Sequence, residues 1–311
     1  MTGAYLKIRN TDGSEFNEPE LLSFNFRKDA YTPYTTLSAR AVTAESLFSS
    51  AAEVMLYVGG ILVHHGLIDS LTAETSSGIT VTSLSSRGFT SLLCQNQIEP
   101  GLKPDISLNS LMDSYYALPY VTHENNSDAS NYIYVKNHST MWDGVANLSY
   151  KLFGTYPYIR GTNCVRVTPV SQPGSFVYTA PELLATGSAI SSKRLASHFH
   201  MADLNGNYGT YDLADNDVIA QKIIRHQYFD LDMQFLRTPP DALDYRDKYC
   251  ARGWKRLFCR YTGYNGEDLS DLVTFGSVTL ERICAVSITG TGGGITTELS
   301  VYRDKFPKEL T

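Results

Sequence analysis

A pair of adjacent glycines, Gly59-Gly60, most constrains the fold of this 311-residue chain. It joins two apolar, β-rich runs in the segment VMLYVGGILVHHGLID, which begins at Val54. A two-residue hairpin turn needs positive φ angles at both central positions, and glycine adopts them without steric cost, so the pattern predicts a β-hairpin. We expect a turn at Ser76–Gly78, a strand from Ile79 to about Leu84 and a short helix within Arg87–Leu93 to follow.

The first hundred residues contain further strand patterns separated by turn signals. Apolar and polar residues alternate from Ala4 to Arg9 and from Leu22 to Arg27, and more weakly from Thr36 to Thr43. Several short strands at close spacing are typical of a small antiparallel barrel or sandwich. Residues 1–100 are therefore predicted to form a first β-barrel domain.

The character of the chain changes after Ile98–Pro104, a segment with two prolines and a glycine. Apolar residues recur at helical spacing in Ser107–Leu118, with Ser107 as the N-cap, and in Ser139–Phe153, which Gly154 should end. Tyr156–Val167 has the pattern of a hairpin. Residues 101–168 are predicted to be a small inserted α+β module.

Residues 169–311 again have mainly strand-like patterns, interrupted by helical insertions, and are predicted to form a second β domain. The fold class is thus mainly β, with two antiparallel barrels and an α+β insert. The elements expected in this last part are strands at Ser191–Asp203 and Leu257–Tyr264, helices at Val218–Tyr228 and Asp241–Arg252, and a closing hairpin of Ser277–Gly290 with Ile295–Tyr302 around Thr291–Gly294.

Charge and hydropathy exclude several classes of protein. The net charge of −6 and the sequence pI near 5.6 provide no basic surface for specific nucleic-acid binding. The chain does not open with a signal peptide and contains no apolar run approaching the roughly 18 residues of a membrane span. We therefore expect a protein without a membrane span.

The five cysteines are odd in number and form no CxxC pair, which fits neither a disulfide framework nor a zinc site. We expect them to be buried free thiols. They are Cys94, Cys164, Cys250, Cys259 and Cys284.

Two histidine pairs are candidates for metal binding. His64 and His65 are adjacent on a predicted strand, so their side chains point to opposite faces and do not converge on one ion. His198 and His200 would share a strand face, but no third ligand is evident nearby in the sequence. No metal or cofactor is expected at either pair.

Aspartates are the other candidates for chemistry. Asp203, Asp212, Asp215 and Asp217 lack the spacing of an EF-hand and are interpreted as an acidic surface loop. Asp230 and Asp232 could act as the paired carboxylates of a glycosidase only if the fold sets a suitable separation.

No nucleophile motif is present, and Gly292–Gly294 lacks the Lys-Ser/Thr of a phosphate-binding loop. Trp142 and Trp254 would serve either sugar stacking or core packing. Lys255, Arg256 and Arg260 form the one basic cluster, interpreted as an interface patch. No catalytic residue is assigned.

The order of these pieces resembles the baseplate hub proteins of phage tails and tail-like particles. The resemblance rests on VMLYVGGILVHHGLID, GITVTSLSSRGFTSLL, STMWDGVANLSYKLFGTYPYIRGTNCVRV and SITGTGGGITTELSVYRDK. It implies two tail-tube-like barrels per chain and a homotrimer that presents six similar units to a hexameric tail tube and meets a trimeric central spike, with the tape measure protein as a further partner. Such a protein would be assembled in the bacterial host cytoplasm, would reside in the baseplate and would not be an enzyme.

Two other functions remain open from the sequence. The aspartates and the aromatic content would also suit a tail-associated cell-wall hydrolase. The tyrosines and tryptophans would suit a carbohydrate- or receptor-binding tail protein.

Overall fold

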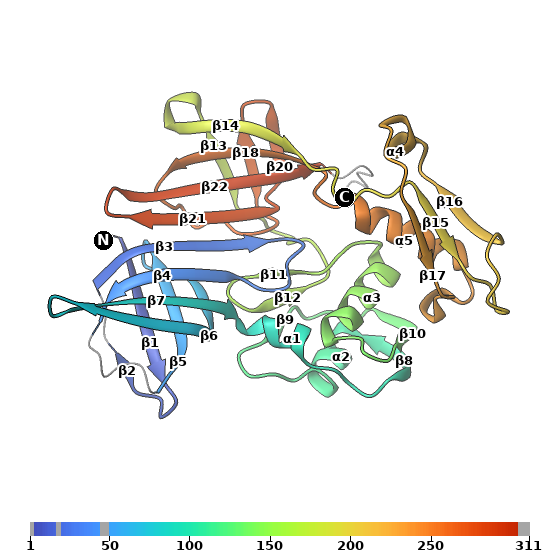
Figure 1. The fold of residues 1–311 in the computed structure, drawn as a ribbon, viewed down its shortest axis with the longest axis horizontal. Helices are drawn as coiled ribbons and strands as arrows, with labels where there is room; N and C mark the ends of the chain where they lie inside the picture. Colours follow the sequence, from blue (N-terminus) through green and yellow to red (C-terminus); the bar gives the residue numbers. More distant parts are fainter. Residues whose placement is uncertain (1–2, 17–19, 44–49, 304–311) are drawn as a thin grey trace.

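The computed structural model describes residues 3–16, 20–43 and 50–303, and Figure 1 shows their arrangement. Strands from both ends of the chain lie side by side in one half of the molecule, and two helix-containing parts make up the other half. None of the described helices is long and apolar enough to cross a membrane.

The N-terminal part is built around the predicted hairpin. Gly59 and Gly60 have φ angles of 58° and 79°, which confirms the tight turn. The second strand of this hairpin continues far past the first and then pairs with the next strand along the chain. The elements are β1 (Ala4–Asn10), β2 (Glu15–Phe16), β3 (Glu20–Asp29), β4 (Thr36–Val42), β5 (Ala51–Val58), β6 (Ile61–Ser76), β7 (Ile79–Gly88), the 3-10 turn η2 (Phe89–Ser91) and α1 (Leu92–Gln95).

The C-terminal part contributes a second antiparallel group and a small mixed sheet. The closing hairpin is confirmed, but the single strand predicted at Ser277–Gly290 is wrong. The chain passes from the small sheet to the large one at Ile283-Cys284, where Ile283 N bonds Asp271 O and Cys284 N bonds Ser300 O. The elements are β13 (Ser175–Tyr178), the 3-10 turn η3 (Ala180–Glu182), β14 (Leu183–Ile190), β18 (Lys255–Thr262), β19 (Leu272–Phe275), β20 (Val278–Arg282), β21 (Ala285–Thr291) and β22 (Gly294–Arg303).

Strands from the two ends of the chain belong to one eleven-stranded sheet, in the order β14-β18-β22-β21-β3-β4-β7-β6-β5-β1-β2. The two parts join where β21 pairs antiparallel with β3, with Ile288 opposite Phe26. The mainly β class is confirmed. The sheet is open, however, and no closed barrel is found among the described strands. A separate barrel would close by pairing its own first and last strands. The edges of β3 and β21 instead pair with each other, so they are not available for such closure.

One hydrophobic core lies beneath both strand groups. It combines Leu56 and Phe26 from the N-terminal strands with Ile288 and Leu299 from the C-terminal ones, and all four are almost fully buried. Val273 of the small sheet packs into the same core. The two ends of the chain therefore fold as one packed unit.

The middle module has its own core and matches the α+β pattern expected from the sequence. Ser107 accepts a hydrogen bond from Ser110 N at 3.2 Å, and Gly154 has φ 66°, so both predicted helix caps are confirmed. The first helix is shorter than expected, because it ends at Ser114. The elements are β8 (Gly101–Ser107), α2 (Leu108–Ser114), β9 (Thr122–His123), β10 (Ala129–Val135), α3 (Met141–Phe153), β11 (Tyr158–Arg160) and β12 (Cys164–Arg166).

A second helix-containing part follows β14. The predicted helix at Asp241–Arg252 is confirmed. The predicted long strand at Ser191–Asp203 is wrong, because the chain turns at Ser192 and only its last residues pair. The helix predicted at Val218–Tyr228 is also wrong, since it stops before Lys222, which has φ 63°. The elements are β15 (His198–Met201), β16 (Tyr211–Ala214), α4 (Asn216–Ala220), β17 (His226–Phe229), the 3-10 turn η4 (Met233–Phe235) and α5 (Pro239–Ala251).

Candidate assembly surface

Eight consecutive strands of the large sheet, from β14 to β6, share an outer face, and this face is mainly polar from β18 to β6. Side chains on the other face, such as Leu37 and Leu84, are buried in the core. Outward-facing residues that stand opposite one another across neighbouring strands form a continuous row of hydroxyl and amide side chains. The row runs through Thr262, Thr296, Thr289, Asn25, Ser38, Ser85 and Ser70.

A shallow groove of about 390 Å³ follows this outer face across β21, β3, β4 and β7. Asn25, Ser38 and Thr289 line it, together with Arg40. Phe24 and Leu84 also line the groove, but both are almost fully buried in the core. The exposed side chains are thus mainly small hydroxyl and amide groups, which remain hydrated. We therefore interpret the groove as part of a smooth polar surface.

Most charges on this face are neutralised locally. Glu298 accepts from Arg256 at 2.9 Å and from Arg260 at 2.8 Å. Arg87 and Asp69 form a two-point ion pair at 2.7 and 2.8 Å. This accounts for the predicted basic cluster around Trp254: two of its three members are ion-paired on the sheet face, and no strongly basic patch results.

The eight strands end in two unpaired edges among the described residues. β14 pairs only with β18, and its sequence LLATGSAI carries no charge and no proline. Beyond Leu67, β6 pairs only with β7. An uncharged edge strand exposes main-chain N–H and C=O groups that readily pair with another chain, and proteins usually block such edges with charges or proline. β14 lacks such blocking residues, whereas the free part of β6 carries Asp69 and Glu74.

His64 and His65 occupy opposite faces, as predicted. His64 is fully buried between Thr35 Oγ1 and Ser86 Oγ, each 2.8 Å from a ring nitrogen, and burial lowers its pKa to about 3. His65 instead lies 2.9 Å from Glu53. Neither histidine is part of a metal site. His64 is a neutral core residue on β6 that links β7 to the residue directly before β4.

His198 and His200 lie on one strand face, as predicted, and the structure adds a third histidine. His226 on β17 stacks on His198, with ring centroids 4.2 Å apart. Asp212 on β16 lies 2.7 Å from His200 Nδ1. Sequence reasoning missed His226 because it lies in a segment assigned to a helix.

The other aspartates have structural roles. Asp203 accepts from the main chain of Asn205 and Asn207 in a turn, and Asp215 caps α4. Asp217 and Asp230 are exposed. Asp232 is buried, caps η4 and forms ion pairs with Lys136 at 3.2 Å and Arg246 at 3.4 Å. The Asp232 carboxylate is thus engaged in a helix cap and two ion pairs, whereas a glycosidase carboxyl must face the substrate.

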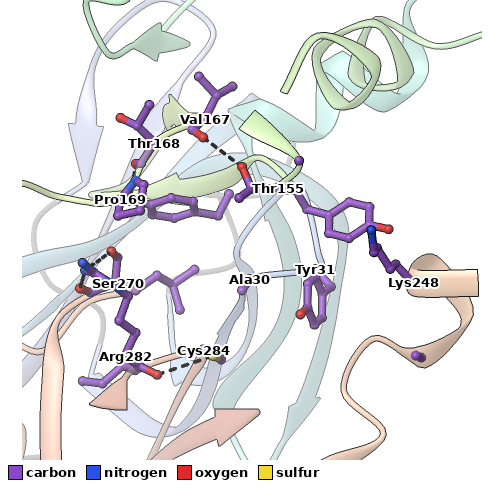
Figure 2. Close-up of a pocket in the computed structure, with 16 residues that line it drawn as sticks. Ala30, Tyr31, Thr155, Val167, Thr168, Pro169, Lys248, Ser270, Arg282 and Cys284 are labelled. Atoms are coloured by element: carbon purple, nitrogen blue, oxygen red, sulfur yellow. Dashed lines mark hydrogen bonds between the residues drawn. The ribbon is translucent and has the colours of Figure 1, made fainter. Parts of the chain in front are cut away.

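An apolar cavity lies where the sheet, the middle module and α5 meet (Figure 2). Figure 2 shows Ala30 and Tyr31 from the end of β3, Thr155 and Pro169 from the middle of the chain, and Cys284 around it. None of the sixteen residues that line it is a histidine or a carboxylate. The cavity thus lacks the pair of carboxylates that a glycosidase uses.

The remaining candidates are also structural. Trp142 and Trp254 are half-buried against apolar clusters, and Gly292–Gly294 turns the β21–β22 hairpin. The cysteines are free, but only Cys259 is fully buried, so the expectation of buried thiols is correct for one of them and too strong for the others. Among the described residues, no group of three or more histidine, cysteine or acidic side chains converges on a metal position.

Comparison with known proteins places this fold. No protein-family model matches the sequence, and no curated protein matches it. Solved structures do match over nearly the whole chain. A tail protein from Neisseria meningitidis MC58 superposes with a TM-score of 0.71 at 14% identity, covering 97% of both chains. The chain has the fold of phage tail proteins.

Two further structures extend this tail-protein fold beyond one phage. The 43 kDa tail protein of prophage MuSo2 from Shewanella oneidensis superposes with a TM-score of 0.68 at 14% identity, covering 96% of this chain and 98% of the other. The E. coli c3393 protein, a type VI secretion component described as similar to T4 gp27 and gp5, gives a TM-score of 0.57 at 8% identity over 96% of this chain and 77% of that one. The resemblance drawn from the sequence is confirmed at the level of the fold.

Proposed function

We propose that the chain is a structural hub subunit of a phage tail or tail-like particle, and that three copies form a ring without enzymatic turnover. The observation that carries the proposal is the pair of unpaired edges, β14 and the end of β6, at opposite ends of an eight-strand run. An interface between two different edges of identical subunits generates rings when the rotation closes. The tail-protein fold supports the same interpretation.

The strand directions suit such closure. Every neighbouring pair from β14 to β6 is antiparallel, so β14 and β6 run in opposite directions. In a ring, β14 of one copy would therefore pair antiparallel with β6 of the next copy. Three copies of eight strands would form a barrel of 24 strands, roughly 40 Å across at ordinary strand spacing.

In this ring, residues 1–100 and 169–311 would each contribute four strands, and residues 101–168 would be the inserted module. Each chain would thus supply two similar tube-like units, six in the trimer. The polar sheet face would line the channel, because its apolar face is already covered by the core. A six-fold tail tube or its initiator would bind one end and a three-fold spike the other, with the tape measure protein in the channel.

This role places the protein in the baseplate of a particle assembled in the host cytoplasm. A tail role is supported by the c3393 protein, which is described as similar to the T4 bacteriophage tail proteins gp27 and gp5. Binding of tube and spike requires shape and edge complementarity rather than a catalytic pocket.

Mass photometry of the purified chain, alone and co-expressed with its spike protein, tests the ring. We expect a species of three times the 34.5 kDa chain mass. Thr186→Lys with Ser188→Lys places two charges on the exposed edge strand and should abolish that species. The matched double substitution Asn137→Lys with Asn207→Lys, at exposed loop positions, should leave it intact.

Two results would contradict the ring. One is a chain that stays monomeric with and without the spike protein, at every concentration tested. The other is a trimer that forms equally well in the β14 double variant, which would show that the edges are not the interface.

A further inference from the structure

Three of the seven histidines meet on one face of the small sheet β16-β15-β17, which lies between β14 and β18 in the sequence and is separate from the large sheet. The parallel register of β15 and β17 places His198 opposite His226. The antiparallel register of β15 and β16 places His200 opposite Asp212. Neighbouring strands thus bring together imidazole and carboxylate groups that the sequence keeps apart.

The hydrogen bonds fix where the protons lie when the rings are neutral. His200 Nδ1 is 2.7 Å from Asp212 Oδ1, and because a carboxylate only accepts, His200 Nδ1–H donates. His200 Nε2 is then an acceptor, and it receives a hydrogen bond from His226 Nδ1–H at 3.0 Å. The two ring planes are 1° apart, so a single proton lies between two nitrogen atoms in a shared plane.

A metal ion can take the place of this shared proton when His226 changes to its Nε2–H tautomer, because the proton then resides on Nε2 and Nδ1 becomes a free ligand. Two imidazole nitrogens bound at about 2.0–2.1 Å, with an angle between 90° and 109°, are about 2.9–3.4 Å apart. The observed separation of His200 Nε2 and His226 Nδ1 is 3.0 Å, which falls within this interval. In the hydrogen bond the two nitrogens face each other in nearly parallel ring planes. Each ring must therefore turn by about 35–45° to direct its lone pair at one ion.

Asp212 already occupies the position of an orienting group. A histidine that binds a metal usually donates its other N–H to a carboxylate, which fixes the ring and raises its basicity. Asp212 accepts such a hydrogen bond from His200 Nδ1–H. Its carboxylate is half exposed, and His226 lies at the surface, so an ion and its water ligands have access.

We propose that His200 and His226 bind a divalent late first-row transition-metal ion, with Cu²⁺ bound most tightly and water filling the remaining positions. The site has only two protein ligands, and the described part of the chain contains no group of three or more histidine, cysteine or acidic residues placed to hold a metal. Imidazole suits Cu²⁺, Ni²⁺ and Zn²⁺, and Cu²⁺ leads their order of affinity. His198 stacks on His226 and shields one side of its ring.

Calorimetric titration of the untagged, chelator-treated full-length chain with CuSO₄ tests the site, alongside electron paramagnetic resonance of the Cu²⁺ complex. We expect one ion per chain and hyperfine splitting from two nitrogen ligands. His226→Gln should remove the two-nitrogen signal, and Asp212→Asn should weaken binding about 10- to 100-fold. His138→Gln, at an exposed position elsewhere, is the matched control and should change nothing.

Circular dichroism of each variant shows whether the fold is retained, and Asp212→Asn keeps both ligands in case His226→Gln disturbs β17. The proposal is overturned if the wild-type chain binds no Cu²⁺. It is also overturned if folded His226→Gln gives the same spectrum and affinity as wild type, since the ion would then bind elsewhere.

Discussion

Lys28 donates a hydrogen bond from Nζ to the main-chain carbonyl oxygen of Gly161, 2.6 Å away. This bond connects β3 of the large sheet to the turn between β11 and β12 of the middle module. The same ammonium group forms an ion pair with Asp268, and burial lowers the pKa of Lys28. One nearly buried cation therefore ties together three parts of the chain that are distant in sequence.

Substitution of Lys28 by Met should destabilise the protein by about 3–5 kcal/mol. It leaves Asp268, itself mostly buried, without its partner charge, and breaking a buried ion pair has a cost of that order. Lys7→Met removes a surface pair with Glu15 and should cost less than about 1 kcal/mol. Urea unfolding monitored by circular dichroism measures both, and equal losses would contradict the buried-pair explanation.

Stability should fall between pH 7 and pH 5 because of His64. Its pKa is about 3 in the folded chain and 6.5 when unfolded, so below pH 6.5 only the unfolded state takes up this proton. The contribution of neutral His64 to the free energy of unfolding is complete above pH 6.5 and declines as the pH falls toward 3. At pH 5 the loss is about 2 kcal/mol.

Free energies of unfolding at pH 7 and pH 5 check this effect. His64→Gln should lose less stability between the two pH values than wild type does, by about 2 kcal/mol. His138→Gln serves as the matched substitution and should keep the wild-type difference. If His64→Gln retains the full pH dependence, His64 is not its source.

Gly66→Ala should destabilise the β6–β7 hairpin. A Cβ at this position would lie 2.2 Å from the carbonyl oxygen of Arg87, and main-chain atoms within a sheet have little room to move. We expect a loss of at least about 2–3 kcal/mol. Gly292→Ala meets no atom within 4 Å and should stay within about 0.5 kcal/mol of wild type. Thermal unfolding that gave equal midpoints would refute the steric explanation.

Substitutions at two neighbouring positions on β4 should differ strongly in their effect on stability. Leu37 is almost fully buried in the shared core, so Leu37→Ala should cost about 2–5 kcal/mol. Ser38 faces outward, and Ser38→Ala should change stability by less than about 0.5 kcal/mol. Chemical unfolding of the two variants measures the contrast, and a large loss for Ser38→Ala would indicate that this face is not free in the isolated chain.

Local features of the fold could be read from the sequence. Gly59 and Gly60 specify the turn through their own backbone freedom, and Gly154 ends α3 for the same reason. Ser107 caps α2 through its own hydroxyl. Each of these signals lies within a few residues of the element it determines.

The long-range pairings could not be read in this way. Nothing in Phe26 or Ile288 indicates that their strands are neighbours, because any two amphipathic strands can pair along their edges. The two expected barrels form one sheet because β3 pairs with β21. The histidine cluster was hidden for a related reason, since His226 joins it through a parallel pairing across 28 positions.

The strand count between the two free edges carries a consequence for evolution. Eight is even, so the first and last strands point in opposite directions, and identical copies repeat without a parallel seam. Loss or gain of a single strand would reverse this parity and prevent antiparallel joining. Relatives that keep the same edges should therefore differ by whole hairpins, and a duplication that widened the channel would have to add strands two at a time.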